Sequence, residues 1–191
     1  MSRVEVTPAA IPAVKIIRVP VFEDPRGTFS EVYNRQALAA AGIAIGFVQD
    51  NVSLSRPVGT VRGLHFQAPP FAQDKLVRVV RGRILDVAVD LRRNSPSFGR
   101  HVAVELSGEN RLQLLVPVGF AHGFCTLAPD TEVYYKVSAH YAAAHDHGLA
   151  WDDPALGIEW PVSPTEALLS DKDRAQPRLA DLPPTLTAWG E

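Results

Sequence analysis

The stretch KLVRVVRGRILDVAVDLR, residues 75–92, constrains the fold of this chain more than any other. Branched apolar residues alternate with polar ones on both sides of Gly82, which is the pattern of strands with one buried face. A glycine between two such runs favours a tight connection, so we expect a β-hairpin here. Residues 100–107, 111–117 and 131–141 repeat the pattern, separated by turn signals at GEN, VGF and APD. Many short strands at regular spacing predict an all-β sandwich or barrel.

One segment predicts a helix. In NRQALAAAG, residues 34–42, Asn34 can cap the first turn and Gly42 can end the last. The 191 residues are enough for a single domain with a sizeable core, and we see no internal repeat or second domain. The 16 prolines gather towards both ends. We therefore expect one domain over residues 1–191, with an extended N-terminal arm at 1–15 and a C-terminal tail at 174–191.

The segment AAIPAVKIIRVPVF, residues 9–22, is rich in strand-forming residues but has no obvious hairpin partner nearby. An unpaired strand edge invites pairing with another chain, so we expect a homodimer in which this N-terminal strand is exchanged. The formal net charge of −2 gives no general basic field for nucleic acid. The beginning of the chain lacks the apolar core of a signal peptide, and no apolar run has membrane-spanning length, which favours a cytoplasmic protein with no membrane partner.

Charged side chains stand on segments that otherwise predict buried strands. The stretch RGLHFQAPPFAQDKLVR, residues 62–78, contains Arg62, His65 and Lys75. A charge that faces the interior of a sheet is costly unless a partner, such as an anionic or carbonyl ligand, pairs with it. Because histidine also titrates near neutral pH, this stretch predicts a binding or acid–base site.

The sequence VPVGFAHGF, residues 116–124, places His122 after a turn and resembles the second motif of cupin domains. Metal-binding cupins also carry a His-x-His pair and a glutamate in their first motif, where this chain has His65 alone. Two histidines are too few for a metal with three or four ligands. The other nearby candidates, His145 and His147, fall in a polar loop that we expect to be exposed. We therefore expect no metal.

The sequence DVAVD places Asp86 and Asp90 on an adjacent strand. An inward aspartate can orient a histidine ring and hold its tautomer, so Asp86 is a candidate partner for a site histidine. The alternative is that each histidine is a core residue whose ring bonds to backbone groups. The single cysteine, Cys125, excludes an internal disulfide framework, and its apolar context GFCTL predicts a buried thiol.

Several segments together resemble the dTDP-4-dehydrorhamnose 3,5-epimerase family. In order, from about Val14 to Asp173, they are DPRGTFSE, FVQDNVSLS, VRGLHFQ, KLVRVVRGRILDVAVDLR, SPSFG, VPVGFAHGF, YYK, WDDPALGIEWP and LSDKD. The resemblance implies a jelly-roll (cupin) β-barrel with a few short helices, a dimeric state and no cofactor. It also implies that a dTDP-4-keto-6-deoxyhexose is the substrate.

The resemblance assigns roles to individual residues. The catalytic residues that it implies are His65, Tyr135, Asp173 and Lys75. Tyr135 rather than Tyr134 matches, because the family's tyrosine directly precedes the lysine of its YK motif. In LSDKD the spacing favours Asp173 as the partner of His65, with Asp171 as a close competitor. The implied substrate-binding residues are Arg26, Phe29, Glu31, Gln49, Asp50, Asn51, Arg62, Lys75, His122, Asp146 and Lys172, where Asp146 stands in place of a frequent glutamate.

In a 4-keto-6-deoxy sugar, C3 and C5 both neighbour the carbonyl carbon, so removing either proton gives an enolate without a redox cofactor or metal. A base on one face and an acid on the other invert the centre, and a fixed cation such as Lys75 stabilises the enolate oxygen. We expect conversion of dTDP-4-dehydro-6-deoxy-α-D-glucose to dTDP-4-dehydro-β-L-rhamnose, in dTDP-L-rhamnose biosynthesis. The alternatives are a 3-epimerase or 5-epimerase of a related sugar, a non-catalytic cupin that binds sugar nucleotides, and a metal-dependent cupin oxygenase.

Overall fold

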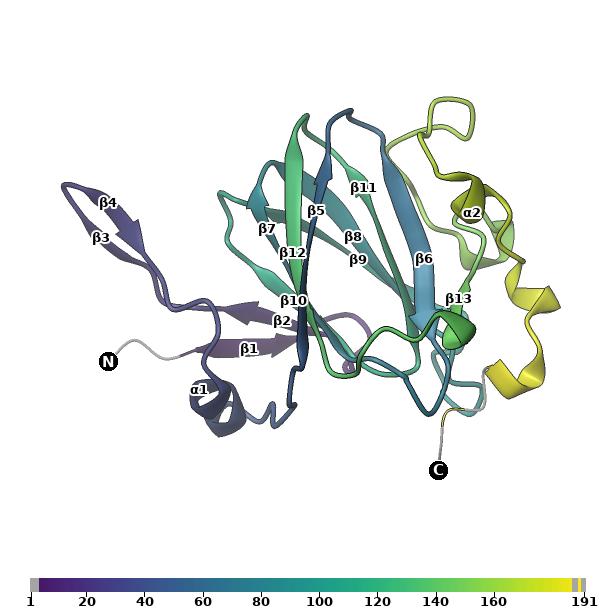
Figure 1. Cartoon of the computed structure of the whole chain (residues 1–191), viewed down its shortest axis with the longest axis horizontal. Coiled ribbons are helices and arrows are strands. Elements are labelled where there is room, and N and C mark those ends of the chain that lie inside the picture. Colours follow the sequence, from purple (N-terminus) through teal and green to yellow (C-terminus); the bar gives the residue numbers. More distant parts are fainter. Residues whose placement is uncertain (1–3, 187–188, 190–191) are drawn as a thin grey trace.

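Two antiparallel sheets face each other in a computed structural model of the chain, which describes residues 4–186 and 189 (Figure 1). The first sheet has the order β1 (Glu5–Pro8), β2 (Lys15–Arg18), β10 (Gln113–Val116), β7 (Lys75–Arg81), β12 (Thr131–Val137), β5 (Gln49–Ser55). The second has the order β13 (Asp146–Gly148), β6 (Val61–Gln67), β11 (Phe120–Thr126), β8 (Arg83–Asp90), β9 (His101–Ser107). The chain crosses repeatedly from one sheet to the other, which confirms the predicted jelly-roll barrel.

Gly82 joins two strands that lie in different sheets, so the predicted hairpin at this position is wrong. β7 pairs with β10 and β12, whereas β8 pairs with β11 and β9. Gly82 has a φ of 82°, in the left-handed region that favours glycine, and a Cβ there would lie 2.9 Å from the Cα of Thr131. The glycine therefore forms a tight corner between the sheets rather than the tip of a hairpin.

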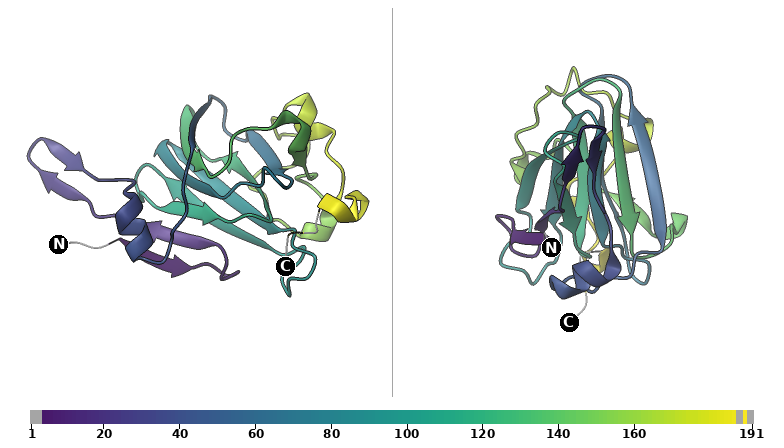
Figure 2. Two further views of the ribbon diagram at one scale, coloured as in Figure 1. Left: turned by 60° about the horizontal axis from the view of Figure 1, so that its bottom comes forward. Right: turned by 90° about the vertical axis from the view of Figure 1, so that its left-hand side faces the viewer.

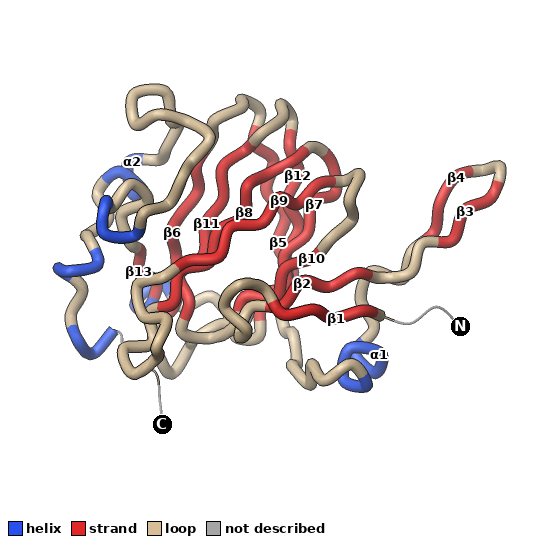
Figure 3. Tube along the Cα trace, turned by 180° about the vertical axis from the view of Figure 1, so that it is seen from behind, coloured by secondary structure: helices blue, strands red, loops and turns tan. Residues whose placement is uncertain are grey.

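The barrel core lies between the two sheets. Alternate side chains of each strand point inward, so both sheets contribute to one apolar cluster that includes Val77, Val79, Ile84, Ala88 and Leu114. Fully burying one such side chain contributes about 1.5–3 kcal/mol to folding. A second apolar cluster covers the outer face of the β6–β11–β8 part, and the C-terminal segment packs onto it (Figure 3).

The predicted helix is confirmed as α1 (Arg35–Ala40). The Asn34 side chain accepts hydrogen bonds from the backbone N–H groups of Gln36 and Ala37, and Gly42 follows with a φ of 90°. The remaining helical turns are short: η1 (Ala143–His145), η2 (Pro154–Leu156), α2 (Asp171–Arg174), η3 (Leu179–Asp181) and η4 (Pro184–Leu186). Within the described residues, every helix is too short or too polar to cross a membrane.

The N-terminal segment does have a local partner, contrary to expectation. β1 and β2 form an antiparallel hairpin, and β2 extends the first sheet by pairing with β10 of the same chain. The turn between them is closed by a hydrogen bond from the Ala9 N–H to the Val14 carbonyl, at 3.0 Å. A second hairpin, β3 (Phe22–Asp24) and β4 (Gly27–Phe29), projects away from the barrel (Figures 1 and 2).

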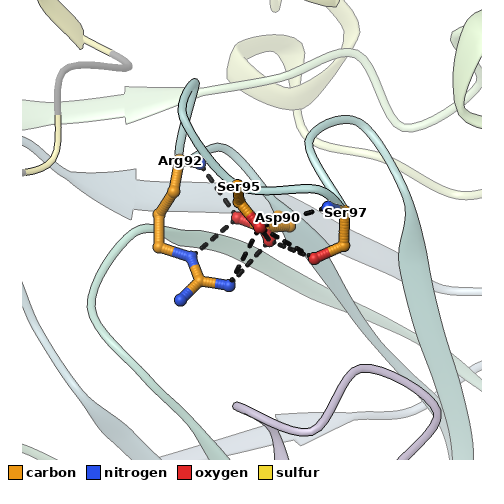
Figure 4. Close-up of polar contacts among 4 residues, drawn as sticks. All are labelled: Asp90, Arg92, Ser95 and Ser97. Carbon is orange, nitrogen blue, oxygen red and sulfur yellow. Dashed lines mark hydrogen bonds and ion pairs between the residues drawn. The ribbon is translucent and has the colours of Figure 1, made fainter.

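Asp90 fixes the turn after β8 and does not orient a histidine (Figure 4). Its buried carboxylate accepts hydrogen bonds from Arg92 Nη2 at 2.7 Å and from the hydroxyls of Ser95 and Ser97, each at 2.6 Å. Burial alone would raise the pKa of Asp90, but these hydrogen bonds hold it below its usual value. The Arg92 guanidinium also lies 4.7 Å from the ring centroid of Phe120, at the beginning of β11, so this turn supports a strand that carries a site histidine.

Candidate active site

An elongated cleft with two lobes lies between the sheets. The lobes have volumes of about 460 and 450 Å³, and His65, Lys75, Tyr135 and Lys172 line both of them. Because the two lobes share these four side chains, we treat them as one cleft. The first lobe continues over Ser53, Arg62, His122, Phe124 and Asp173, and the second over Gln49, Asn51, Gln67, Gln73, Tyr141 and Asp146.

His65, in the middle of β6, donates a hydrogen bond from Nε2 to Asp173 Oδ1 at 2.5 Å. Asp173 lies in α2, where the Ser170 side chain caps the helix by accepting from the Asp173 N–H at 3.1 Å. Asp173 is buried and Asp171 is exposed, so of the two candidates the structure brings Asp173 to the histidine. Burial would raise the pKa of Asp173, but the hydrogen bond from His65 holds it below its usual value. The carboxylate therefore stays ionised beside the ring.

Lys75 supplies a buried amine at the beginning of β7. Its Nζ donates to the backbone carbonyl of His65 at 3.3 Å, and the residue is only 8% exposed. Burial lowers the pKa of Lys75 to about 8, although the negative charges of Asp146 and Asp86 oppose this shift. The cleft therefore holds a cation whose charge is lost at mildly alkaline pH.

Tyr135 faces the cleft from β12, in the sheet opposite His65. It lies across from Asn51 of β5 and packs against the inner apolar cluster, and burial raises its pKa. Tyr134 points to the outer face of the sheet, where the Nζ of Lys136 lies 5.6 Å from its ring centroid. This outcome agrees with the alternation expected for a strand.

His122 and Asp86 form a second histidine–aspartate pair. His122 Nε2 lies 2.7 Å from Asp86 Oδ1, and both residues are buried. In the β11–β6 register His122 is directly opposite His65, so the two histidines lie on neighbouring strands. The contact that the sequence suggested for Asp86 is thus present, and His122 reaches the first lobe.

The predicted residues Arg62, Gln49, Asn51, Asp146 and Lys172 also line the cleft. The guanidinium of Arg62 donates to the Ser55 hydroxyl at 3.0 Å, and Gln49 Nε2 donates to Asn51 Oδ1 at 2.9 Å. Lys172 Nζ donates to Asp146 Oδ2 at 2.5 Å, and the Tyr141 hydroxyl donates to the same oxygen at 3.1 Å. β13, which begins at Asp146, therefore contributes to the second lobe.

Four predicted substrate-binding residues do not line the cleft of their own chain. The Asp50 side chain points to the outer face of β5, between two inward residues, and forms an ion pair with Lys136 at 2.7 Å. Arg26 and Phe29 lie on the β3–β4 hairpin, where Arg26 pairs with Asp24, and Glu31 follows the hairpin. None of these three lines either lobe.

Sequence reasoning missed Ser53, Gln67, Gln73 and Tyr141 as lining residues. The alternation along β5 could have found Ser53, because it lies on the same face as Asn51. The two histidines that were predicted to lie in an exposed loop are half-buried and lie in regular elements. His145 ends η1 and packs against Phe71, and His147 lies in β13 and packs against Phe66. Cys125 is buried as predicted, and burial raises its pKa to about 11.

Over residues 4–186 and 189, His, Cys, Asp and Glu side chains do not gather in groups of three or more that could hold a metal ion. The groups that do converge on the cleft are an imidazole paired with a carboxylate, an amine and a phenol. Together they can remove, stabilise and return a proton.

Comparison with known proteins points to the same family that the sequence motifs resemble. A family profile described as dTDP-4-dehydrorhamnose 3,5-epimerase matches residues 8–181. A protein of that name from Sinorhizobium fredii (strain NBRC 101917 / NGR234) is 56% identical over 174 residues, covering 91% of this chain and 89% of the relative.

Two solved structures have similar folds. A dTDP-4-dehydrorhamnose 3,5-epimerase from Bacillus anthracis with TDP and PPi bound has a TM-score of 0.89 and 50% identity, covering 92% of this chain and 99% of that one. A dTDP-6-deoxy-D-glucose-3,5-epimerase from Legionella pneumophila in complex with dTDP-4-keto-L-rhamnose has a TM-score of 0.93 and 38% identity, covering 99% of this chain and 100% of that one. On this evidence, and with the cleft described above, the chain belongs to the dTDP-4-dehydrorhamnose 3,5-epimerase family.

Proposed function

We propose that this protein converts dTDP-4-dehydro-6-deoxy-α-D-glucose to dTDP-4-dehydro-β-L-rhamnose by inverting C3 and C5. The observation that carries the proposal is that His65, paired with Asp173, and Tyr135 face one cleft from opposite sheets. Inversion requires proton removal on one face of the sugar and proton return on the other. The name of the Sinorhizobium relative and the ligand in the Legionella structure support this choice of substrate.

The proposed reaction begins with His65. Because its Nε2 is bonded to Asp173, Nδ1 is the ring nitrogen that takes the proton from C3 or C5, and the carboxylate stabilises the imidazolium that forms. The Lys75 ammonium stabilises the negative charge that develops on the C4 oxygen. Tyr135 then delivers a proton from the opposite face. The ketone itself stabilises the carbanion as an enolate, so no cofactor takes part in the proposal.

The second lobe suits the nucleotide portion of the substrate. Gln49 and Asn51 offer amide groups to a base edge, and Tyr141, 61% exposed, offers an aromatic face for stacking. Arg62, whose guanidinium is held by Ser55, lines the first lobe, where it can donate forked hydrogen bonds to oxygen atoms of the substrate.

We also propose that the protein is a homodimer. The β3–β4 hairpin exposes Phe22 and Phe29 at 55% and 69%, and the outer face of β5 exposes Val52 at 67%. Apolar side chains exposed to this extent indicate a contact surface. In a dimer the hairpin could bring Arg26 and Phe29 to the cleft of the partner. The exchanged N-terminal strand stays part of this proposal, because β1 is the outermost of the described strands at that side of the first sheet, where a strand of the partner can pair with it.

Deuterium exchange tests the function. Turnover of dTDP-4-dehydro-6-deoxyglucose in deuterated water is expected to place deuterium at both C3 and C5 of the product, as read by NMR.

His65→Ala should lower exchange at both positions by about a hundred- to ten-thousandfold, because the general base is lost, and should leave dTDP binding intact. Exchange at one carbon would identify a 3- or 5-epimerase, and binding without exchange a non-catalytic protein. Activity lost to a chelator and restored by a metal would contradict the cofactor-free mechanism.

The two adjacent tyrosines, Tyr135 and Tyr134, provide a test variant and its matched control. Tyr135→Phe keeps the ring and its packing but removes the proton donor, so deuterium uptake at C3 is expected to survive while inversion at C5 falls steeply. Tyr134→Phe, on the outer face of β12, should leave the stereochemistry unchanged. The measurement is the ratio of C5-inverted product to exchanged starting material. The opposite result would transfer the role of acid to Tyr134.

The pH dependence follows from Lys75. Its ammonium form is the one that stabilises the enolate, and its pKa is about 8, so kcat/KM is expected to fall about tenfold per pH unit above pH 8. Lys75→Arg should move this alkaline limb to higher pH in the residual activity, because a guanidinium stays protonated. An alkaline limb that remains near pH 8 in Lys75→Arg would assign the titration to another group.

Subunit complementation tests the dimer. Light scattering should give about twice the 20.8 kDa chain mass. A His65→Ala chain mixed with an Arg26→Ala, Phe29→Ala chain should regain activity, because one cleft of the heterodimer then combines an intact His65 with an intact partner hairpin. If each hairpin serves its own chain, the mixture stays as inactive as its components.

A further inference from the structure

The hydroxyl of Ser53 is buried in the wall of the cleft without a hydrogen-bond partner. Three other buried side-chain atoms in the described part of the chain share this property: Ser30 Oγ, Asp86 Oδ2 and Trp189 Nε1. Ser30, Asp86 and Trp189 line neither lobe, and the other carboxylate oxygen of Asp86 is bonded to His122. Among these four atoms, therefore, Ser53 Oγ alone belongs to a residue that lines the cleft.

Ser53 is also the exception along its own strand. The inward residues of β5 are Gln49, Asn51, Ser53 and Ser55. Gln49 donates to Asn51 at 2.9 Å, and the Ser55 hydroxyl accepts from Arg62 at 3.0 Å. A buried hydroxyl with no partner destabilises the folded state, and buried polar groups of native proteins are bonded with few exceptions. The missing partner of Ser53 is therefore expected to be a group that enters the cleft.

The strand register places Ser53 beside the proposed acid. In the β5–β12 pair Asn51 is opposite Tyr135 and Ser53 is opposite Val133, so Ser53 and Tyr135 are diagonal neighbours on one face. Ser53 lines the first lobe, together with Asp173 and His122, and not the second lobe with its amide side chains. It therefore lies at the sugar end of the cleft, on the Tyr135 side.

We propose that Ser53 binds a ring hydroxyl of the hexose and holds the sugar between His65 and Tyr135. This inference rests on the proposed function. The 4-keto-6-deoxyhexose keeps free hydroxyls at C2 and C3, and either one can both donate to and accept from a serine hydroxyl. A site built to bond a substrate hydroxyl discriminates strongly against an analogue that lacks it, because the buried group of the protein is then left unpaired. Ser53 is thus a specificity-determining residue for the sugar.

The test combines one variant with two substrate analogues. Ser53→Ala is expected to lower kcat/KM for dTDP-4-dehydro-6-deoxyglucose about ten- to a hundredfold, and to leave dTDP binding unchanged. Its melting temperature should stay the same or rise, since an unpaired hydroxyl is replaced by an apolar group. With one of the two analogues, 2-deoxy or 3-deoxy, the wild type and the variant should have equal kcat/KM values. The analogue that makes them equal identifies the hydroxyl that Ser53 binds.

Ser107→Ala is the matched control. The Ser107 hydroxyl, on β9 and outside both lobes, accepts from the Asn110 N–H at 2.9 Å, so its loss should lower the melting temperature and leave kcat/KM unchanged. Wild-type kinetics in Ser53→Ala, an unchanged penalty with both analogues, or a loss of stability together with dTDP binding would each overturn the inference. Failure of the wild-type protein to turn over the keto sugar would instead overturn the proposed function.

Discussion

The hydrogen bond between His65 and Asp173 is the contact on which the arrangement of the cleft depends. It joins residues 108 positions apart in the sequence and connects the second sheet to α2. A buried carboxylate is costly unless charged or hydrogen-bonding partners compensate it, and here the imidazole of His65, the hydroxyl of Ser170 and the backbone N–H of Gly63 do so. The same bond fixes which ring nitrogen is left for the substrate, so one contact positions the C-terminal segment and prepares the base.

The jelly-roll fold supplies the other feature that the proposed reaction requires, which is a cleft with two opposed walls. Because β6 and β12 belong to different sheets, His65 and Tyr135 reach the cleft from opposite sides. Lys75 enters at the beginning of β7, where its amine meets the backbone of β6. The corner at Gly82 and the turn fixed by Asp90 support the strands that carry these groups. Reactions that need opposed proton donors and acceptors suit such a barrel.

The alternation of residues predicted much of this in advance. It located most of the strands and placed Tyr134 and Tyr135 on opposite faces, while the family motif selected Tyr135. The local capping signal of Asn34 located α1. It did not show which strands pair, because a period of two is the same for a hairpin and for a corner between sheets, and the prediction at Gly82 was therefore wrong. Family motifs name consecutive residues, whereas only alternate ones share a face, and so the side chains of Gln49 and Asn51 line the cleft while that of Asp50 points outward.

Other features depend on information that the linear sequence does not contain. The unpaired hydroxyl of Ser53 becomes visible only when every possible partner has a position. The place of the β3–β4 hairpin, with Arg26 and Phe29, depends on what a second copy of the chain contacts. Sequence patterns report local geometry and burial well, but they report the pairing of distant groups poorly.

A crystal structure of the wild-type protein with a bound dTDP-4-keto-6-deoxyhexose, or with a dTDP-sugar that mimics it, would test the central claim most directly. The account predicts that the sugar ring lies between the two sheets, with His65 Nδ1 and the Tyr135 hydroxyl on opposite faces and each about 3–3.5 Å from the carbon that it serves. A ring bound with both groups on the same face would contradict it.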